Sequence, residues 1–161
     1  MEESAARLAL RCRLAVATRE EILDWANRHG DAFEQTGMGW DEIHATGLGR
    51  LQTRLADQML SRSQDGFRID SELGIRLCKE ILCAEIVRLH RKEILPKEFC
   101  SSMMTLEAYY LDNTPGRAYP YFLGDLYNAC DWCSNDDPQY NTDYLLEETQ
   151  RLLDEHSRAR S

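Results

Sequence analysis

Apolar residues recur along this chain at intervals of three and four, which is the spacing of one face of an α-helix. The pattern is strongest in residues 71–93, where two adjacent apolar rows run the length of the segment. A stripe that wide predicts a central, largely buried helix. The two rows are Leu73, Leu77, Ile81 and Ala84, and Cys78, Leu82, Ile86 and Leu89.

Residue types typical of helix N-termini indicate where the other helices begin. Thr18 and Glu21 have the spacing of a capping box, Asp70 or Ser71 suits an N-cap, and Pro96 suits a first turn. Residues 30–40 contain three glycines and predict a connection between helices. Helices are therefore expected over about residues 3–17, 18–29, 41–60, 71–93 and 96–111, with a break near Gly47 and Gly49 left open. A further helix bears Phe122, Leu126, Ala129 and Cys133. The last helix is capped by Asn141 or Thr142 and bears Leu145, Leu146, Leu152 and Leu153.

Composition agrees with a helical fold. Only nine glycines and four prolines occur in 161 residues, and good helix formers dominate. This length suits one domain that can bury a real core. We therefore predict an all-α protein folded as a single compact helical bundle over residues 1–161.

The charge is concentrated in the last third of the chain. Between Glu98 and Glu155 there are twelve Asp or Glu residues and two Arg, a local balance of −10 in a protein of net charge −9. Such a surface repels nucleic acid and favours a basic protein as partner. The alternative is an ordinary solvated helical face that serves solubility.

No part of the sequence indicates a membrane. The N-terminal stretch begins with acids and its apolar part is interrupted by Arg, unlike a signal peptide. No apolar run approaches the roughly 18 residues that span a bilayer. We expect a cytoplasmic protein whose six cysteines are reduced thiols.

Candidate chemistry is sparse. Cys130 and Cys133 form a C-x-x-C pair, but it ends a helix and has no second ligand pair, so structural thiols are favoured over a redox or zinc site. His44 follows Asp41 and Glu42, but no nucleophile lies near it in sequence, so a histidine on a helix surface is favoured over acid–base catalysis. The sequence therefore predicts no cofactor, no metal and no enzymatic activity. A hydrolase would require a Cys–His or carboxylate pocket formed by the fold.

Three motifs in the second half of the chain stand out together: LPKEFC at the entry to one helix, YFLGDLYNACDWCSNDD, and YNTDYLLEETQRLL. Through them the chain, from about residue 77 to residue 155, resembles the colicin-D-type immunity family, the bacterial self-protective colicin-like immunity proteins. The resemblance implies a stoichiometric inhibitor of a bacteriocin or contact-dependent toxin. The expected target is a tRNA-cleaving nuclease, with an acidic face in the basic site that receives RNA phosphates.

The resemblance and the charge together give a set of candidate partner-binding residues. Acidic side chains would supply fast association, and aromatic side chains would be the desolvated anchors of the interface. The rival interpretation is an acidic all-α adaptor or regulator that docks a basic partner protein, and nothing in the sequence indicates an oligomeric state. The candidate residues are Asp125, Tyr127, Asp131, Trp132, Asp136, Asp137, Tyr140, Asp143, Glu147 and Glu148.

Overall fold

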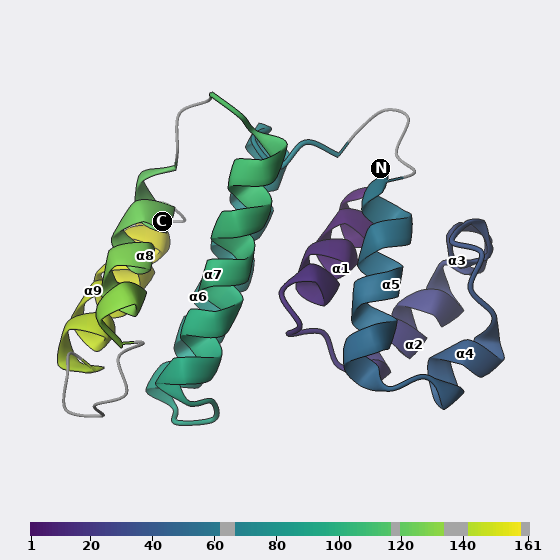
Figure 1. Ribbon diagram of the computed structural model, residues 1–161, viewed down its shortest axis with the longest axis horizontal. Coiled ribbons are helices and arrows are strands. Elements are labelled where there is room, and N and C mark those ends of the chain that lie inside the picture. The colour runs from purple at the N-terminus through teal and green to yellow at the C-terminus, as the bar shows by residue number, and fades with distance from the viewer. Residues whose placement is uncertain (62–66, 117–119, 134–141, 159–161) are drawn as a thin grey trace. The chain divides into compact units, whose positions relative to one another are not determined.

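The computed structural model describes residues 1–61, 67–116, 120–133 and 142–158, and every regular element in those ranges is an α-helix (Figure 1). The predicted all-α fold is confirmed. The chain divides into two compact units, Met1–Arg68 and Ile69–Ser161, and each is described here by itself. The prediction that residues 1–161 form one domain stays a prediction.

The first unit contains α1 (Glu3–Arg13), α2 (Arg19–Arg28), α3 (Gly30–Gln35), α4 (Trp40–Ala45) and α5 (Leu48–Ser61). Helices α1 and α5 pack side by side, and α2 contacts α3 and α4 (Figure 1). Their apolar faces share one core, which includes Ala9, Ile22, Phe33, Ile43 and Leu55.

The capping box that opens α2 is confirmed. The Thr18 hydroxyl accepts a hydrogen bond from the Glu21 N–H (3.1 Å), and the Glu21 carboxylate accepts one from the Thr18 N–H (2.8 Å). These two bonds satisfy amide groups that the first turn of a helix leaves without partners.

Two boundaries in this unit differ from the prediction, and a third was left open. Helix α1 ends at Arg13 and not near Ala17, because the Arg11 carbonyl accepts the N–H groups of Val16 and Ala17 and closes the turn early. The break left open near Gly47 is present, between α4 and α5. The expected connection over residues 30–40 contains α3, because burial of Phe33 (1% exposed) stabilises a helical turn that the glycines disfavour.

The second unit contains α6 (Glu72–His90), α7 (Pro96–Asn113), α8 (Tyr121–Cys133) and α9 (Thr142–Arg158). Helix α7 packs against α6 and α8, and α9 packs against α8 and α6. The four helices therefore close a cycle in which each contacts two neighbours, which is the arrangement of a four-helix bundle.

The predicted apolar rows of α6 are largely correct. The Ser71 hydroxyl accepts the Gly74 N–H at 3.1 Å and caps the helix. Three positions depart from the prediction: Leu73 is half-buried, Ala84 is exposed, and Glu85 is buried and pairs with Arg88 at 2.8 Å. A helix with two neighbours has a solvent-facing side, and Ala84 lies on it. The buried apolar residues of the two rows are Leu77, Cys78, Ile81, Leu82, Ile86 and Leu89.

The remaining helices pack as their patterns predict. Pro96 lies in the first turn of α7, where the Glu98 carboxylate accepts the Leu95 N–H at 2.7 Å. Leu145 and Leu152 of α9 are buried, whereas Leu146 and Leu153 are half-buried. The inward rows of α7 and α8 are Phe99, Met103, Leu106 and Tyr110, and Phe122, Leu126 and Ala129.

Candidate functional site

Arg151 on α9 is the centre of an ion-pair cluster that joins α9 to α8. Its Nη2 and Nε atoms donate to the Glu148 carboxylate at 2.9 and 3.1 Å, and its Nη1 donates to Glu155 at 2.6 Å. Its Nη2 also pairs with Asp125 of α8. Three carboxylates therefore share one guanidinium, and the cluster keeps a net charge of −2.

Tyr121 at the start of α8 completes this cluster. Arg151 Nη1 donates to the Tyr121 hydroxyl at 2.7 Å, and the guanidinium carbon lies 5.4 Å from the centroid of the ring. That distance is within the range of a cation–π contact. The hydrogen bonds to Glu148 and then to Asp125 hold the pKa of Arg151 above its ordinary value, so the residue stays charged at any physiological pH.

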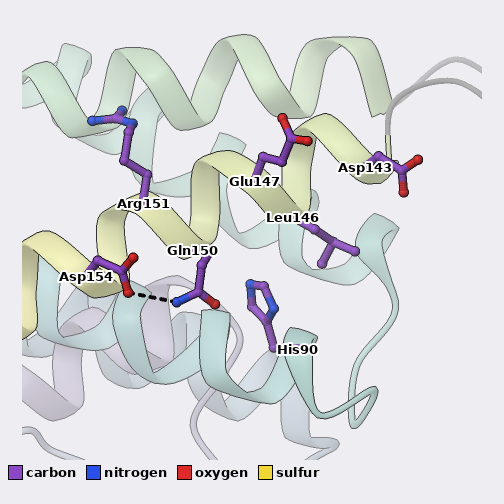
Figure 2. Close-up of a pocket in the computed structure, with 7 residues that line it drawn as sticks. All are labelled: His90, Asp143, Leu146, Glu147, Gln150, Arg151 and Asp154. Atoms are coloured by element: carbon purple, nitrogen blue, oxygen red, sulfur yellow. Dashed lines mark hydrogen bonds between the residues drawn. The ribbon is translucent and has the colours of Figure 1, made fainter.

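A shallow groove of about 620 Å³ runs beside this cluster, between the C-terminal end of α6 and the exposed side of α9 (Figure 2). Within the described residues, the carboxylates of Asp143 and Glu147 make no hydrogen bond or ion pair. The groove is lined by His90, Asp143, Leu146, Glu147, Gln150, Arg151 and Asp154.

Hydrogen bonds fix which atoms of the groove can act as acceptors. The Thr149 hydroxyl, which is fully buried, donates to the Leu145 carbonyl (2.8 Å), so the His90 Nε2 at 3.0 Å donates to the hydroxyl oxygen. The other ring nitrogen, Nδ1, is then the acceptor when the imidazole is neutral. Gln150 Nε2 donates to Asp154 at 2.9 Å, which leaves the amide oxygen of Gln150 as an acceptor (Figure 2).

The groove is therefore rich in acceptors and poor in donors. Arg151 is its only fully charged donor among the residues that line it, and its guanidinium is engaged by Asp125, Glu148 and Glu155. A surface of this kind suits a guanidinium or ammonium group, because such groups carry only donors.

The structure separates the predicted partner-binding residues into distinct environments. Asp125 and Glu148 belong to the Arg151 cluster, whereas Asp143 and Glu147 line the groove. On α8, Asp131 is exposed and Tyr127 is half-buried. The side chain of Trp132, and all of Asp136, Asp137 and Tyr140, lie outside the described residues.

Sequence reasoning missed three groove residues: His90, Gln150 and Asp154. Asp154 follows Glu147 by seven residues and Asp143 by eleven, so helical spacing alone places these three acids on one side of α9. No local signal could place His90 there, because it reaches the groove from α6, at a sequence separation of 59 from its partner Thr149.

The cysteines whose side chains the structure describes are buried and form no disulfide among themselves. Burial raises the pKa of both Cys12 and Cys78 to about 12. Cys130 is fully buried on α8, and the side chain of Cys133 lies outside the described residues. The residues that the structure describes include no group of three His, Cys, Asp or Glu side chains placed to hold a metal ion. None of the described helices has the length and apolar character needed to cross a bilayer.

Comparison with known proteins found no relative: no family model, no curated protein and no solved structure matches this chain.

Proposed function

We propose that this protein is an immunity-type inhibitor that binds a basic nuclease toxin domain through the acidic side of α9. A tRNA-cleaving bacteriocin or contact-dependent toxin is the favoured target. The observation that carries the proposal is the groove beside α9, whose lining includes Asp143, Glu147 and Asp154. An inhibitor that occupies the active site of a toxin needs to catalyse no reaction, so the proposed function is binding alone. We propose that this binding takes place in the cytoplasm.

The chemistry of the groove matches that of a nuclease site. Such sites use Lys and Arg to hold phosphates, and these side chains present donors only. The groove presents carboxylates, the Gln150 amide oxygen and the His90 Nδ1 as acceptors. An acidic side of α9 would occupy the positions that phosphates take, and the charge would speed the first encounter.

The Arg151 cluster supports the proposal because its ion pairs fix α8 and α9 relative to each other beside the groove. Because Arg151 pairs with Asp125 on α8 and with Glu148 on α9, the two helices are tied together beside the groove. Side chains that are already ordered lose less conformational entropy when a partner binds. Asp125 and Glu148 would then act mainly by positioning, and Asp143, Glu147 and Asp154 would meet the partner.

The test measures association with the nuclease toxin domain encoded beside this gene. Asp143→Asn, Glu147→Gln and Asp154→Asn are combined in one variant, and association is followed by stopped flow at several ionic strengths. We expect association about tenfold slower than for the unmodified protein at low salt, because charge steering contributes from 10-fold to 10³-fold. The difference should shrink as added salt screens the remaining charges.

A matched control removes the same charge elsewhere. Glu20, Asp31 and Glu34 are exposed acids of the first unit that make no ion pair within the described residues. Their amide variant should associate at nearly the same rate as the unmodified protein. If both variants associate equally slowly, the effect comes from net charge and not from the groove. If neither variant is slowed, the interface does not include these acids of α9. Binding to a basic protein that is not a nuclease would favour the adaptor function.

A further inference from the structure

Four polar or aromatic side chains converge in the first unit, which contributes no residue to the proposed toxin-binding site. Glu2 and Ser4 lie at the start of α1, and Trp25 and His29 lie at the end of α2. Ser4 Oγ is 3.5 Å from His29 Nε2, and His29 Nδ1 is 3.8 Å from the Glu2 carboxylate. A serine, a histidine and a carboxylate are thus arranged in the order of a nucleophile, its base and the group that orients the base.

The carboxylate determines which ring nitrogen can act as the base. Glu2 lies on the Nδ1 side of His29, so the tautomer that its charge favours carries the proton on Nδ1. The lone pair of Nε2 then faces the Ser4 hydroxyl. That hydroxyl donates to Glu2 at 3.2 Å, and a rotation about the Cβ–Oγ bond of Ser4 turns its proton toward Nε2. Catalytic hydrogen bonds are often long before substrate binds and shorten in the complex.

Trp25 holds the other side of this arrangement. Its ring stacks on that of His29, with centroids 5.3 Å apart and planes inclined by 24°, which fixes the face that the imidazole presents. Its indole N–H lies 3.4 Å from Ser4 Oγ and donates to it, so it would stabilise negative charge developing on that oxygen.

The start of α1 supplies donors for a second oxygen. The first backbone bond of the helix joins the Ala6 N–H to the Glu2 carbonyl, and the Glu2 side chain does not cap the helix. The N–H groups of Ser4 and Ala5 therefore have no acceptor within the described residues. Unpaired amides at a helix N-terminus stabilise an oxyanion, because they point along the axis and carry partial positive charge.

We propose that Ser4 is the nucleophile of an acyl-transfer site that hydrolyses small acyl esters. Ser4 Oγ attacks the ester carbonyl carbon while its proton passes to His29 Nε2, and Glu2 stabilises the imidazolium. The bond to the leaving alcohol breaks, and the alcohol takes the proton from His29. Water then attacks the acyl-serine in the same manner, with His29 as the base, and releases the carboxylic acid and the free Ser4 hydroxyl.

The surrounding cavity sets the size of the substrate. It measures about 500 Å³, and Leu8 and Trp25 contribute apolar wall beside Ser4. The side chains of Arg7 and Arg28 also line it. A short acyl chain would lie on the apolar wall, with the carbonyl oxygen at the first turn of α1.

The test uses the full chain with an unmodified N-terminus and a fluorophosphonate probe, which reacts with activated serines. Labelling is followed by intact mass, and the labelled serine is located by peptide mapping. We expect one adduct, on Ser4, whose rate of formation falls about 100-fold or more in His29→Gln, since a general base contributes from 10²-fold to 10⁴-fold. Ser4→Ala should abolish labelling, and Glu2→Gln should slow it. Hydrolysis of p-nitrophenyl acetate should fall in parallel.

Two controls separate activation from incidental reactivity. Ser157→Ala removes an exposed serine of α9, and His44→Gln removes an exposed histidine of α4. Both should leave labelling of Ser4 unchanged. Circular dichroism of every variant checks that it is folded. Absence of an adduct on Ser4 in the unmodified protein, or labelling of Ser4 that persists in folded His29→Gln, overturns the proposal. Neither result bears on toxin binding by α9.

Discussion

The Arg151 cluster makes a quantitative prediction, because one substitution removes several contacts of known geometry. In Arg151→Gln, the carboxylates of Asp125, Glu148 and Glu155 lose their shared cation, and Tyr121 loses a hydrogen bond and a cation–π contact. The side chains are 21–40% exposed, so the values measured for exposed ion pairs apply.

Each such pair contributes about 0.2–1 kcal/mol, and an exposed cation–π contact contributes about 0.5–1 kcal/mol. With three pairs and one ring contact, and with repulsion among the carboxylates that remain, we expect the free energy of unfolding to fall by about 2 kcal/mol.

Urea unfolding followed by circular dichroism measures this loss. The control is Arg76→Gln on α6, which breaks an ion pair with Glu80, one helical turn away at 3.3 Å, a contact worth about 0.3–0.5 kcal/mol. In about 1 M salt the Debye length falls to roughly 3 Å, so the difference between the two variants should narrow. Equal losses at low salt would refute the idea that Arg151 joins α8 to α9. The same conclusion would follow if the loss in the free energy of unfolding for Arg151→Gln did not change with salt concentration.

Two further predictions follow from burial. Ile81→Ala or Leu82→Ala on α6 should each lower the free energy of unfolding by about 2–5 kcal/mol, against less than about 0.5 kcal/mol for Leu95→Ala, whose side chain is 67% exposed. Because burial raises the pKa of Cys12 and Cys78 from 9.0 to about 12, the folded protein binds more protons than the unfolded chain between those values. Stability contributed by each thiol is present below pH 9 and is lost as the pH rises toward 12, by up to about 1.4 kcal/mol per pH unit for each thiol. Urea titrations over that range should show a shallower decline in Cys12→Ala and Cys78→Ala than in the unmodified protein.

The sequence predicted the helices well wherever one residue type decides the local structure. Thr18 and Ser71 mark the starts of α2 and α6 because a hydroxyl can accept an amide that the first turn leaves unpaired. The exposure of Ala84 and the presence of α3 within residues 30–40 differ from the prediction for another reason. Whether a position on a helix is buried depends on which helices lie against it, and a short helix such as α3 depends on where Phe33 packs.

The candidate site was predicted less well, because charge can be counted from a sequence and ion pairing between helices cannot. Glu148 and Glu155 lie three and four residues from Arg151, so their pairing with it follows from helical spacing. The pairing of Asp125 with Arg151 joins residues 26 apart and needs the packing of α8 against α9.

That long-range pair changes how the acidic third of the chain should be interpreted. A carboxylate that already holds a guanidinium must lose that partner, or share it, before it can receive a cation from another protein. Asp125 and Glu148 are in that position, whereas Asp143 and Glu147 make no such pair within the described residues. The count of twelve acids therefore overstates the number of carboxylates that can take a cation from a partner without losing one of their own. Attraction at a distance depends on all of these acids, but the contacts that slow dissociation should come from Asp143 and Glu147.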